Sequence, residues 1–246
     1  MEIYLIRHAQ STNNALADEH QRVCDPQITE LGHRQAERVG RHLAQGVNLE
    51  MTVGASEEET HVRKQRGYGL TRLYCSAMTR SMQTAAYISR ETGLTAEIWL
   101  DLHEIGGIYD GHPDLENMVG RPGKTRAEIE QEFPGFIIPD EVSNDGWWNR
   151  PYEDWPTAAG RAVRVAEALR KMATTAAKDE RIALVTHGGF MDALLKALTN
   201  QLPSTPVFFY HFNTAITRLD LHPDGFMGIR YLNRVPHLSE TPELVT

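Results

Sequence analysis

Two histidines each follow directly on a short apolar run of residues. His8 comes after residues 3–7 (IYLIR), and His187 comes after residues 182–186 (IALVT). Histidine is a common nucleophile and acid–base group in enzymes, because a neutral imidazole carries a free lone pair near pH 7. One histidine at the end of a strand is usually structural, but two in equivalent positions indicate a catalytic pair.

Polar side chains that could bind phosphate accompany these histidines. Arg7 precedes the first histidine, and Ser11 and Asn14 follow it. Arg80 lies at the predicted start of a helix, and Glu104 follows another apolar run. Arginine suits phosphate because its planar guanidinium donates two hydrogen bonds to two oxygens. Each arginine alone would more often form a surface ion pair, so the indication comes from the whole set.

The apolar pattern predicts how these residues are brought together. Strands are expected at residues 3–6, 70–75, 96–100, 181–186, 215–221 and 227–232, and helices at residues 29–45, 79–92, 125–133, 157–177 and 189–198. This alternation predicts a three-layer α/β/α sandwich with a mostly parallel sheet. The last two strands, joined by residues 222–225 (HPDG), are expected to form an antiparallel edge. Ligands of such sheets bind at the carboxyl ends of the strands, where the candidate residues would meet.

Two segments interrupt the alternation of strands and helices. Residues 46–69 are polar and highly charged, and we interpret them as a solvated insertion. Residues from about 106 to 156 are rich in glycine, proline and aromatic side chains and form a second insertion. We therefore expect residues 1–246 to form a single domain that carries these two insertions.

The composition argues against several classes of function. The 246-residue chain has a formal net charge of −8, which disfavours a large nucleic-acid-binding surface but allows a small positive pocket. No apolar run is long enough to span a membrane, and no signal peptide is expected. The two cysteines, Cys24 and Cys75, lack a zinc-binding spacing. We expect a cytoplasmic protein with a small phosphorylated substrate, no nucleic-acid or membrane partner, no metal and no cofactor, and the sequence leaves a homodimer open.

Taken together, the motifs resemble those of the histidine phosphatase superfamily, which includes the cofactor-dependent phosphoglycerate mutases. Residues 7–11 (RHAQS), followed by Asn14, resemble the family's Arg-His-Gly motif, and residues 186–189 (THGG) match its second histidine. Four further segments of this chain resemble family segments and follow in the family's order: residues 28–36, 76–85, 102–111 and 213–219. The resemblance therefore extends along nearly the whole chain and implies a phosphoglycerate mutase-like fold.

The resemblance also implies a role for each candidate residue. His8 would become phosphohistidine, and Glu104 would protonate the leaving oxygen and then activate water. The residues that would hold the phosphoryl oxygens are Arg7, Ser11, Asn14, Arg80 and His187. Positioning and positive charge are the main needs of phosphoryl transfer. Glu104 must be protonated in the first step, favoured by partial burial or by the substrate's negative charge, and a backbone carbonyl should fix one nitrogen of His8.

Two residues beside the first histidine depart from the family pattern. Ala9 replaces a glycine, and its methyl group is expected to tighten the packing near the phosphate while the site survives. Gln10 replaces a frequent glutamate, which removes a negative charge and should not harm anion binding.

The segment after the acid glutamate lacks the stretch with which the mutases grip their substrate's carboxylate. Its aromatic side chains either line the pocket and favour an apolar or aromatic substrate, or pack the insertion onto the core. These aromatic residues are Tyr109, Phe133, Phe136, Trp147, Trp148, Tyr152 and Trp155. The basic residues that either contact further anionic groups or face solvent are Arg121, Lys124, Arg126 and Arg150.

Three functions therefore fit the sequence. The first is a metal-independent phosphatase that hydrolyses a phosphate monoester through His8. The second is a transferase of the phosphoglycerate mutase type. The third is a non-catalytic phosphate-binding protein on the same fold, which is disfavoured because every catalytic position holds a competent residue.

Overall fold

The computed structural model describes residues 1–46, 67–203 and 206–246. Its centre is a six-stranded sheet in the order β3-β2-β6-β1-β7-β8. The strands of this sheet are β1 (Glu2–Arg7), β2 (Arg72–Cys75), β3 (Ala96–Ile98), β6 (Arg181–Thr186), β7 (Ile216–Leu221) and β8 (Met227–Arg234). Strands β3, β2, β6 and β1 pair in parallel, whereas β7 is antiparallel to both β1 and β8. The predicted mostly parallel sheet with an antiparallel edge is confirmed.

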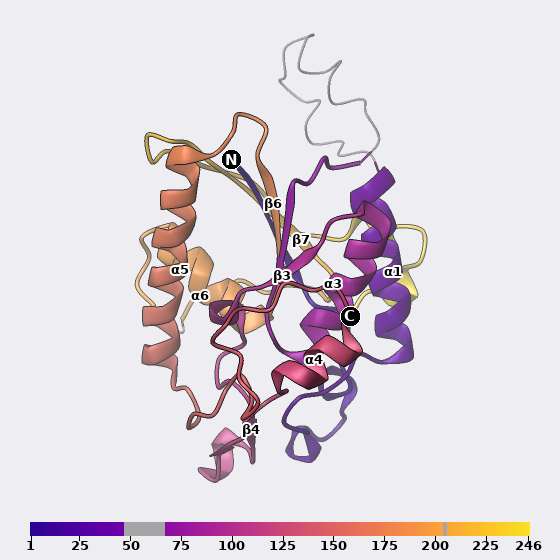
Figure 1. Cartoon of the computed structure of the whole chain (residues 1–246), viewed down its shortest axis with the longest axis vertical. Helices are drawn as coiled ribbons and strands as arrows, with labels where there is room; N and C mark the ends of the chain where they lie inside the picture. Colours follow the sequence, from indigo (N-terminus) through magenta and orange to yellow (C-terminus); the bar gives the residue numbers. More distant parts are fainter. Residues whose placement is uncertain (47–66, 204–205) are drawn as a thin grey trace.

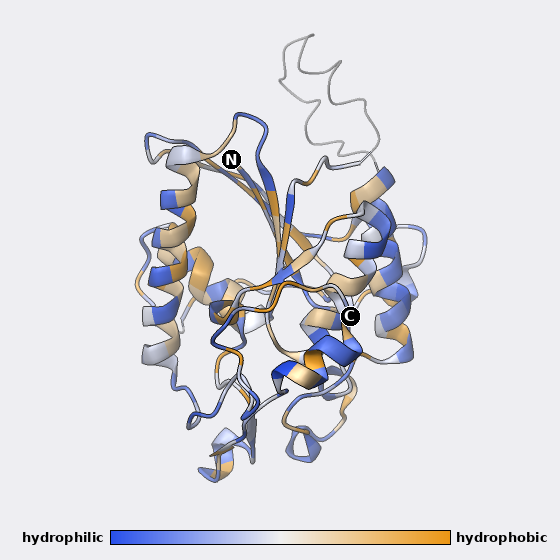
Figure 2. Ribbon diagram, in the orientation of Figure 1, coloured by the Kyte–Doolittle hydropathy of each residue, from blue (hydrophilic) through white to orange (hydrophobic). Residues whose placement is uncertain are grey.

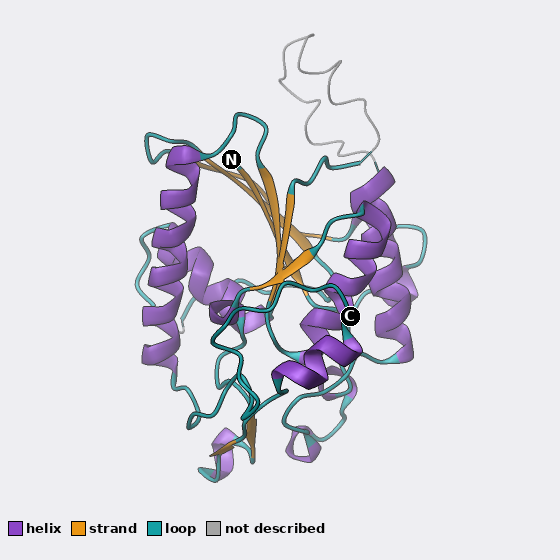
Figure 3. Ribbon diagram, in the orientation of Figure 1, coloured by secondary structure: helices purple, strands orange, loops and turns teal. Residues whose placement is uncertain are grey.

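Helices cover both faces of this sheet. Helices α1 (Glu30–Gln45) and α3 (Thr79–Thr92) lie on one face, and α5 (Trp155–Thr175) and α6 (Gly188–Leu198) lie on the other (Figure 1). Figure 3 shows the strands between these two groups, which is the predicted three-layer arrangement. The apolar surfaces of the helices face the sheet in Figure 2, because burying them there removes them from water.

Local sequence signals account for where the helices begin and end. Thr29 starts α1, because its side-chain oxygen accepts a hydrogen bond from the backbone N–H of Gly32 at 3.0 Å. Gly93 ends α3 in the left-handed conformation, with φ of 75°, which glycine adopts without steric cost. His8, Arg80 and His187 lie at the carboxyl edge of the sheet because they follow the ends of β1, β2 and β6.

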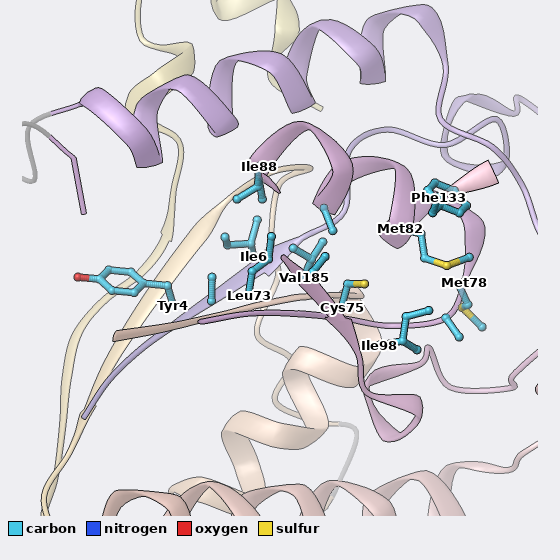
Figure 4. Packing of buried hydrophobic residues seen from close by; sticks show 14 of the residues in the cluster. Tyr4, Ile6, Leu73, Cys75, Met78, Met82, Ile88, Ile98, Phe133 and Val185 are labelled. Carbon is cyan, nitrogen blue, oxygen red and sulfur yellow. The ribbon is translucent and has the colours of Figure 1, made fainter. Parts of the chain in front are cut away.

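The hydrophobic core has two parts, one on each face of the sheet. Alternate residues of β1 enter different parts: Tyr4 and Ile6 pack toward α1 and α3, whereas Ile3 and Leu5 pack toward α5 and α6. Figure 4 shows the first part, where Ile6 lies near Leu73 and Val185 among other apolar side chains. Cys75 is completely buried and behaves as a small apolar core residue. A strand buried on both faces explains why the run before His8 is continuously apolar.

The two insertions have different outcomes. Most of the polar insertion, residues 47–66, lies outside the described residues. The aromatic-rich insertion contains α4 (Arg126–Glu132) and a short hairpin of β4 (Tyr109–Asp110) and β5 (Val119–Gly120). It also extends the sheet, since the backbone N–H of Ile98 donates to the carbonyl oxygen of Ile137 at 2.9 Å. That residues 1–246 form one domain stays a prediction.

One detail of the predicted site needs correction. The third strand was expected at residues 96–100, with Glu104 close to its end, but β3 ends at Ile98. A short turn, η4 (Leu100–Leu102), then leads to Glu104.

Within the described residues, no helix is both long enough and apolar enough to cross a membrane.

Candidate active site

A cavity of about 430 Å³ opens where β1 and β2 end. The predicted site residues that line it are Arg7, His8, Ser11, Asn14, Arg80 and Glu104. The remaining one, His187, is completely buried, and its ring centroid lies 5.0 Å from that of His8. The two histidines are neighbours because β1 and β6 pair in parallel, with Arg7 opposite Thr186.

The ring of His8 is fixed through one of its two nitrogens. Its Nδ1 lies 2.7 Å from the carbonyl oxygen of Ala9, so this hydrogen bond assigns the ring proton to Nδ1. Nε2 keeps its lone pair and accepts a hydrogen bond from Nε of Arg80 at 3.2 Å. Burial, and then the charges of Arg80 and Arg7, hold the pKa of His8 well below its ordinary value. His8 is therefore a neutral imidazole with its nucleophilic nitrogen beside a guanidinium.

Neither guanidinium beside His8 has a carboxylate within hydrogen-bond distance among the described residues, although Asp25 and Glu104 add negative charge nearby. Arg7 donates from Nη1 to the carbonyl oxygen of His211 at 2.5 Å, while its buried Nε has no hydrogen-bond partner within the same residues. Arg80 is 9% exposed, and its Nη1 lies 4.0 Å from Oδ1 of Asp25. Buried cations are normally paired with carboxylates. An arriving anion would supply the missing partner, which makes this part of the cavity suitable for phosphate.

Glu104 is held at the start of α6 by backbone groups. Its Oε1 accepts from the N–H of Phe190 at 2.8 Å and of Ile105 at 2.9 Å, and its Oε2 accepts from the N–H of Gly189 at 3.1 Å. Gly189 and Phe190 belong to the first turn of α6, and together with Ile105 they fix the orientation of the carboxylate at the cavity.

His187 lies behind the cavity with one nitrogen free. Its Nε2 is 2.9 Å from the hydroxyl oxygen of Ser76, which already accepts from the N–H of Met78 at 3.1 Å. Among the described residues the Ser76 hydroxyl has no other acceptor, so we assign it as the donor to Nε2 and place the ring proton of His187 on Nδ1. That buried Nδ1 has no hydrogen-bond partner within the same residues. Burial holds the pKa of His187 well below its ordinary value, so the ring is neutral.

Ser11 and Asn14 form a small network at the cavity wall. The amide oxygen of Asn14 accepts from the N–H and from the hydroxyl of Ser11, at 3.1 and 3.0 Å. Asn213, which the sequence analysis did not single out, donates from Nδ2 to the carbonyl oxygen of His8 at 2.9 Å. Among the described residues the NH₂ group of Asn14 has no acceptor, so it remains available to a ligand.

The alanine that replaces the family's glycine fits the local backbone. Ala9 does not adopt a positive φ, is completely buried and packs with Ile28 and Ala36. Its methyl group therefore enters the core and does not line the cavity, so the tighter packing expected near the phosphate is not observed. Gln10 also points away from the cavity and accepts from the hydroxyl of Thr29 at 2.7 Å.

The aromatic residues of the insertion mostly pack inside the protein. Trp147 and Trp148 are only 4% and 3% exposed and contact the ring of His103. Tyr109 alone among the seven aromatic candidates lines the cavity, and Tyr152 packs against its ring. Of the two predicted interpretations, packing of the insertion onto the core is the one that the geometry supports.

The four basic candidates of the insertion do not line the cavity either. Arg121 and Lys124 form ion pairs with Asp110 and Glu132. Arg126 donates to backbone carbonyl groups, and Arg150 lies over the ring of Trp148.

The cavity has further wall residues that sequence reasoning missed. These residues include Asn13, Glu19, Arg22 and His112. They come from segments without hydrophobic periodicity. Only the excess of polar side chains in residues 12–22 could have drawn attention to Asn13, Glu19 and Arg22, and no such signal surrounds His112. In the part of the chain that the structure describes, no three His, Cys, Asp or Glu side chains are grouped to hold a metal ion.

Several buried histidines predict that the protein loses stability in acid. Burial lowers the pKa of His211 to about 4 and that of His237 to about 3, and it holds the pKa values of His8, His103 and His187 well below the ordinary value. The unfolded chain binds protons at these histidines near pH 6.5, whereas the native protein does not. The free energy of unfolding should therefore fall as the pH drops below 6.5, by about 1.4 kcal/mol per pH unit for each such histidine.

Urea unfolding between pH 7.5 and 4.5 measures this effect. A His237→Gln variant should show a shallower pH dependence below pH 6.5, because it lacks one of the buried groups. The matched control is His222→Gln, which changes an exposed histidine. A free energy of unfolding that stays constant or rises as the pH falls to 5 would contradict the assignment of neutral buried rings.

Comparison with known proteins agrees with the family resemblance and with the fold. A family model described as the histidine phosphatase superfamily (branch 1) matches residues 3–53 and 52–234. A Yersinia pestis protein named "Probable phosphoglycerate mutase GpmB" is 26% identical over 144 residues, which is 58% of this chain and 56% of the relative. The match thus spans about half the length of these curated relatives.

Solved structures share the fold at low sequence identity. Bacillus stearothermophilus YhfR aligns with a TM-score of 0.58 and 21% identity over 97% of this chain and 99% of its own. Mycobacterial glucosyl-3-phosphoglycerate phosphatase gives a TM-score of 0.58 and 19% identity, over 95% and 99%. Entamoeba histolytica phosphoserine phosphatase in complex with 3-phosphoglyceric acid gives 0.60 and 18%, over 96% and 98%.

Proposed function

The chain belongs to the histidine phosphatase superfamily, and we propose that it is a phosphatase that hydrolyses phosphate monoesters through a phosphohistidine at His8. The observation that carries this proposal is the state of His8. Its Nδ1 is fixed by the carbonyl oxygen of Ala9, and its Nε2 lone pair lies beside the guanidinium of Arg80 in a cavity. A neutral, oriented nucleophile next to positive charge suits an in-line attack on phosphorus.

The residues around His8 have complementary parts in the proposed reaction. Nε2 of His8 attacks phosphorus while the bond to the alcohol oxygen breaks, and Glu104 gives its proton to that oxygen. Water then attacks the phosphohistidine, passes a proton to Glu104 and releases phosphate, which restores the lone pair on Nε2. Arg7 and Arg80 neutralise the phosphoryl oxygens, and these guanidiniums supply the positive charge without a metal ion. In this proposal the Nδ1–H of His187 donates to an oxygen of the phosphate at His8, which is supported by the 5.0 Å between the two ring centroids and by the lack of another partner for Nδ1 among the described residues.

A phosphoglycerate mutase-type transferase is the second candidate, because the curated relatives carry that name. The two candidates differ in what accepts the phosphoryl group, water or a second substrate hydroxyl. The chain lacks the segment with which the mutases hold the substrate carboxylate, and this difference favours hydrolysis.

Hydrolysis of p-nitrophenyl phosphate in the presence of EDTA tests the proposal. We expect release of p-nitrophenol between pH 5.5 and 7.5, and an equal amount of inorganic phosphate. No release under these conditions would contradict a metal-independent phosphatase. Conversion of 3-phosphoglycerate to 2-phosphoglycerate that depends on a bisphosphoglycerate primer, with little free phosphate, would instead favour the transferase.

A further inference from the structure

Arg22 lies in the wall of the catalytic cavity and has no part in the proposed reaction. It follows the turn η2 (Glu19–Gln21) and is half-buried. Its Nη1 donates to the carbonyl oxygens of Tyr109 and Gly111, at 3.1 and 3.4 Å. Its guanidinium carbon lies 3.9 Å from the centre of the Tyr109 ring. The side chain is therefore held in one position by the opposite loop, which reduces the entropy lost when it binds a ligand.

The Nε and Nη2 atoms of this guanidinium have no hydrogen-bond acceptor among the described residues. The five N–H groups of arginine include three on Nε and Nη2. Across residues 1–46, 67–203 and 206–246, these three have no acceptor, and no carboxylate lies within 4.0 Å of Arg22. Arg121, by contrast, donates from Nε to Asp110 nearby. Nε and Nη2 together form the fork that binds a carboxylate or phosphate through two parallel hydrogen bonds.

The cavity is large enough for more than the phosphoryl group. Its volume of about 430 Å³ falls in the range of sites that hold a whole small molecule. Arg7 and Arg80 lie beside His8, while Arg22 makes its hydrogen bonds to the loop at residues 109–111. A substrate phosphate at His8 would leave the Arg22 fork free for another group of the same molecule.

We propose that Arg22 binds a second anionic group, a carboxylate or a phosphate, on the alcohol portion of the substrate. This inference rests on the proposed function, because it assigns a substrate class to the same site. The wall near Arg22 is not uniformly positive, since Glu19 also lines the cavity and its Oε2 lies 4.0 Å from Nε2 of His112. Glu19 would suit an ammonium group instead, and the test below separates that case.

Binding to the His8→Ala variant tests the inference without turnover. Two probe pairs differ mainly in the second group: glycerol 3-phosphate against 3-phosphoglycerate, and fructose 6-phosphate against fructose 1,6-bisphosphate. In at least one pair, we expect the probe that carries the second anionic group to bind about 10–100-fold more tightly than its partner. A hydrogen-bonded pair of opposite charges allows a difference of this size. The pair that shows the difference identifies the second group as a carboxylate or as a phosphate.

Replacing Arg22 should abolish this preference and little else. In the same background, Arg22→Gln should weaken binding of the preferred probe to the level of its partner and leave the partner's Kd within about twofold. Arg22→Lys should retain part of the preference, because lysine keeps the charge but not the fork. Arg121→Gln is the matched control, since it removes a nearby arginine outside the cavity. Equal binding within both pairs, or an equal loss for both members of a pair in Arg22→Gln, would overturn the inference. Weaker binding of the preferred probe in Glu19→Gln would also overturn it, because Glu19 should repel an anion.

Turnover by the protein with His8 intact separates this inference from the proposed function. Arg22→Gln should lower kcat/KM for the preferred ester by about 10–100-fold and leave kcat/KM for p-nitrophenyl phosphate unchanged within about twofold. If Arg22 instead held the transferred phosphoryl group, both substrates would lose equally. Absence of all hydrolysis together with the expected binding preference would contradict the phosphatase and retain the Arg22 subsite.

Discussion

His8→Ala is expected to lower kcat/KM for p-nitrophenyl phosphate by about 10⁴-fold or more, the scale of loss when a covalent nucleophile is removed. No other described side chain of the cavity offers a neutral nitrogen in the same position: His112 belongs to the outer wall, and the ring of His187 is completely buried. The variant should also fail to form a phosphoenzyme. Acid-quenched and alkali-quenched samples, after brief exposure to ³²P-labelled substrate, distinguish an acid-labile phosphohistidine from other adducts.

The fold should survive this substitution, which keeps the test interpretable. The imidazole of His8 contributes hydrogen bonds to the Ala9 carbonyl and to Arg80, but its neighbours on β1 stay packed in the core. Circular dichroism and urea unfolding should therefore resemble those of the unmodified protein. His222→Ala, in the exposed turn between β7 and β8, is the matched control and should keep full activity. Activity within tenfold of the unmodified protein, or an acid-labile phosphoenzyme in His8→Ala, would contradict the assignment.

Added imidazole offers a second readout for the same variant. Because His8→Ala leaves space beside Arg80, free imidazole could occupy it and accept the phosphoryl group, yielding phosphoimidazole. Partial rescue that saturates with imidazole concentration would agree with a nucleophilic role. A purely structural role for His8 would not produce phosphoimidazole.

Much of the framework that positions His8 could be predicted because its signals are local. Continuous apolar runs marked the strands, Thr29 marked the start of α1, and Gly93 marked the end of α3. The meeting of His8 and His187 followed from two apolar strands that each end in histidine and pair in parallel. The family resemblance linked Arg80 and Glu104 to the same edge of the sheet.

The outer wall of the cavity could not be predicted, because it depends on contacts between irregular loops. Arg22 bonds to Tyr109 across a sequence separation of 87 residues, with no periodic pattern at either end. Asn213 reaches His8 from 205 residues away. The aromatic insertion was ambiguous for a similar reason. Its composition fits both a pocket wall and a core, and only the packing of its side chains distinguishes these two interpretations. Substrate preference, which depends on this outer wall, was therefore least accessible from the sequence.

Glu104→Gln is expected to slow substrates in proportion to their need for a proton. A positioned general acid contributes about 10²–10⁴-fold, and most for poor leaving groups. For alkyl phosphates such as glycerol 3-phosphate we expect kcat/KM to fall by about 10²–10⁴-fold, whereas for p-nitrophenyl phosphate it should fall less than about tenfold. The ratio kcat/KM is the appropriate quantity, because it reports transfer to His8 and excludes the later hydrolysis of the phosphoenzyme.

The second half of the reaction gives Glu104→Gln a distinct signature. If Glu104 also activates water, the variant should release one equivalent of p-nitrophenol in a burst and then accumulate phosphohistidine at His8. Glutamine keeps one oxygen for the N–H groups of Ile105 and Phe190, so the loop position should persist. Glu167→Gln, on the exposed side of α5, is the control for the loss of one negative charge. Equal slowing of good and poor leaving groups, without a burst, would mean that Glu104 only orients the site. The logarithm of kcat/KM can be plotted against the pKa of the leaving alcohol. A slope that is steeper only in Glu104→Gln requires proton transfer from Glu104, since orientation by three backbone donors affects every ester alike.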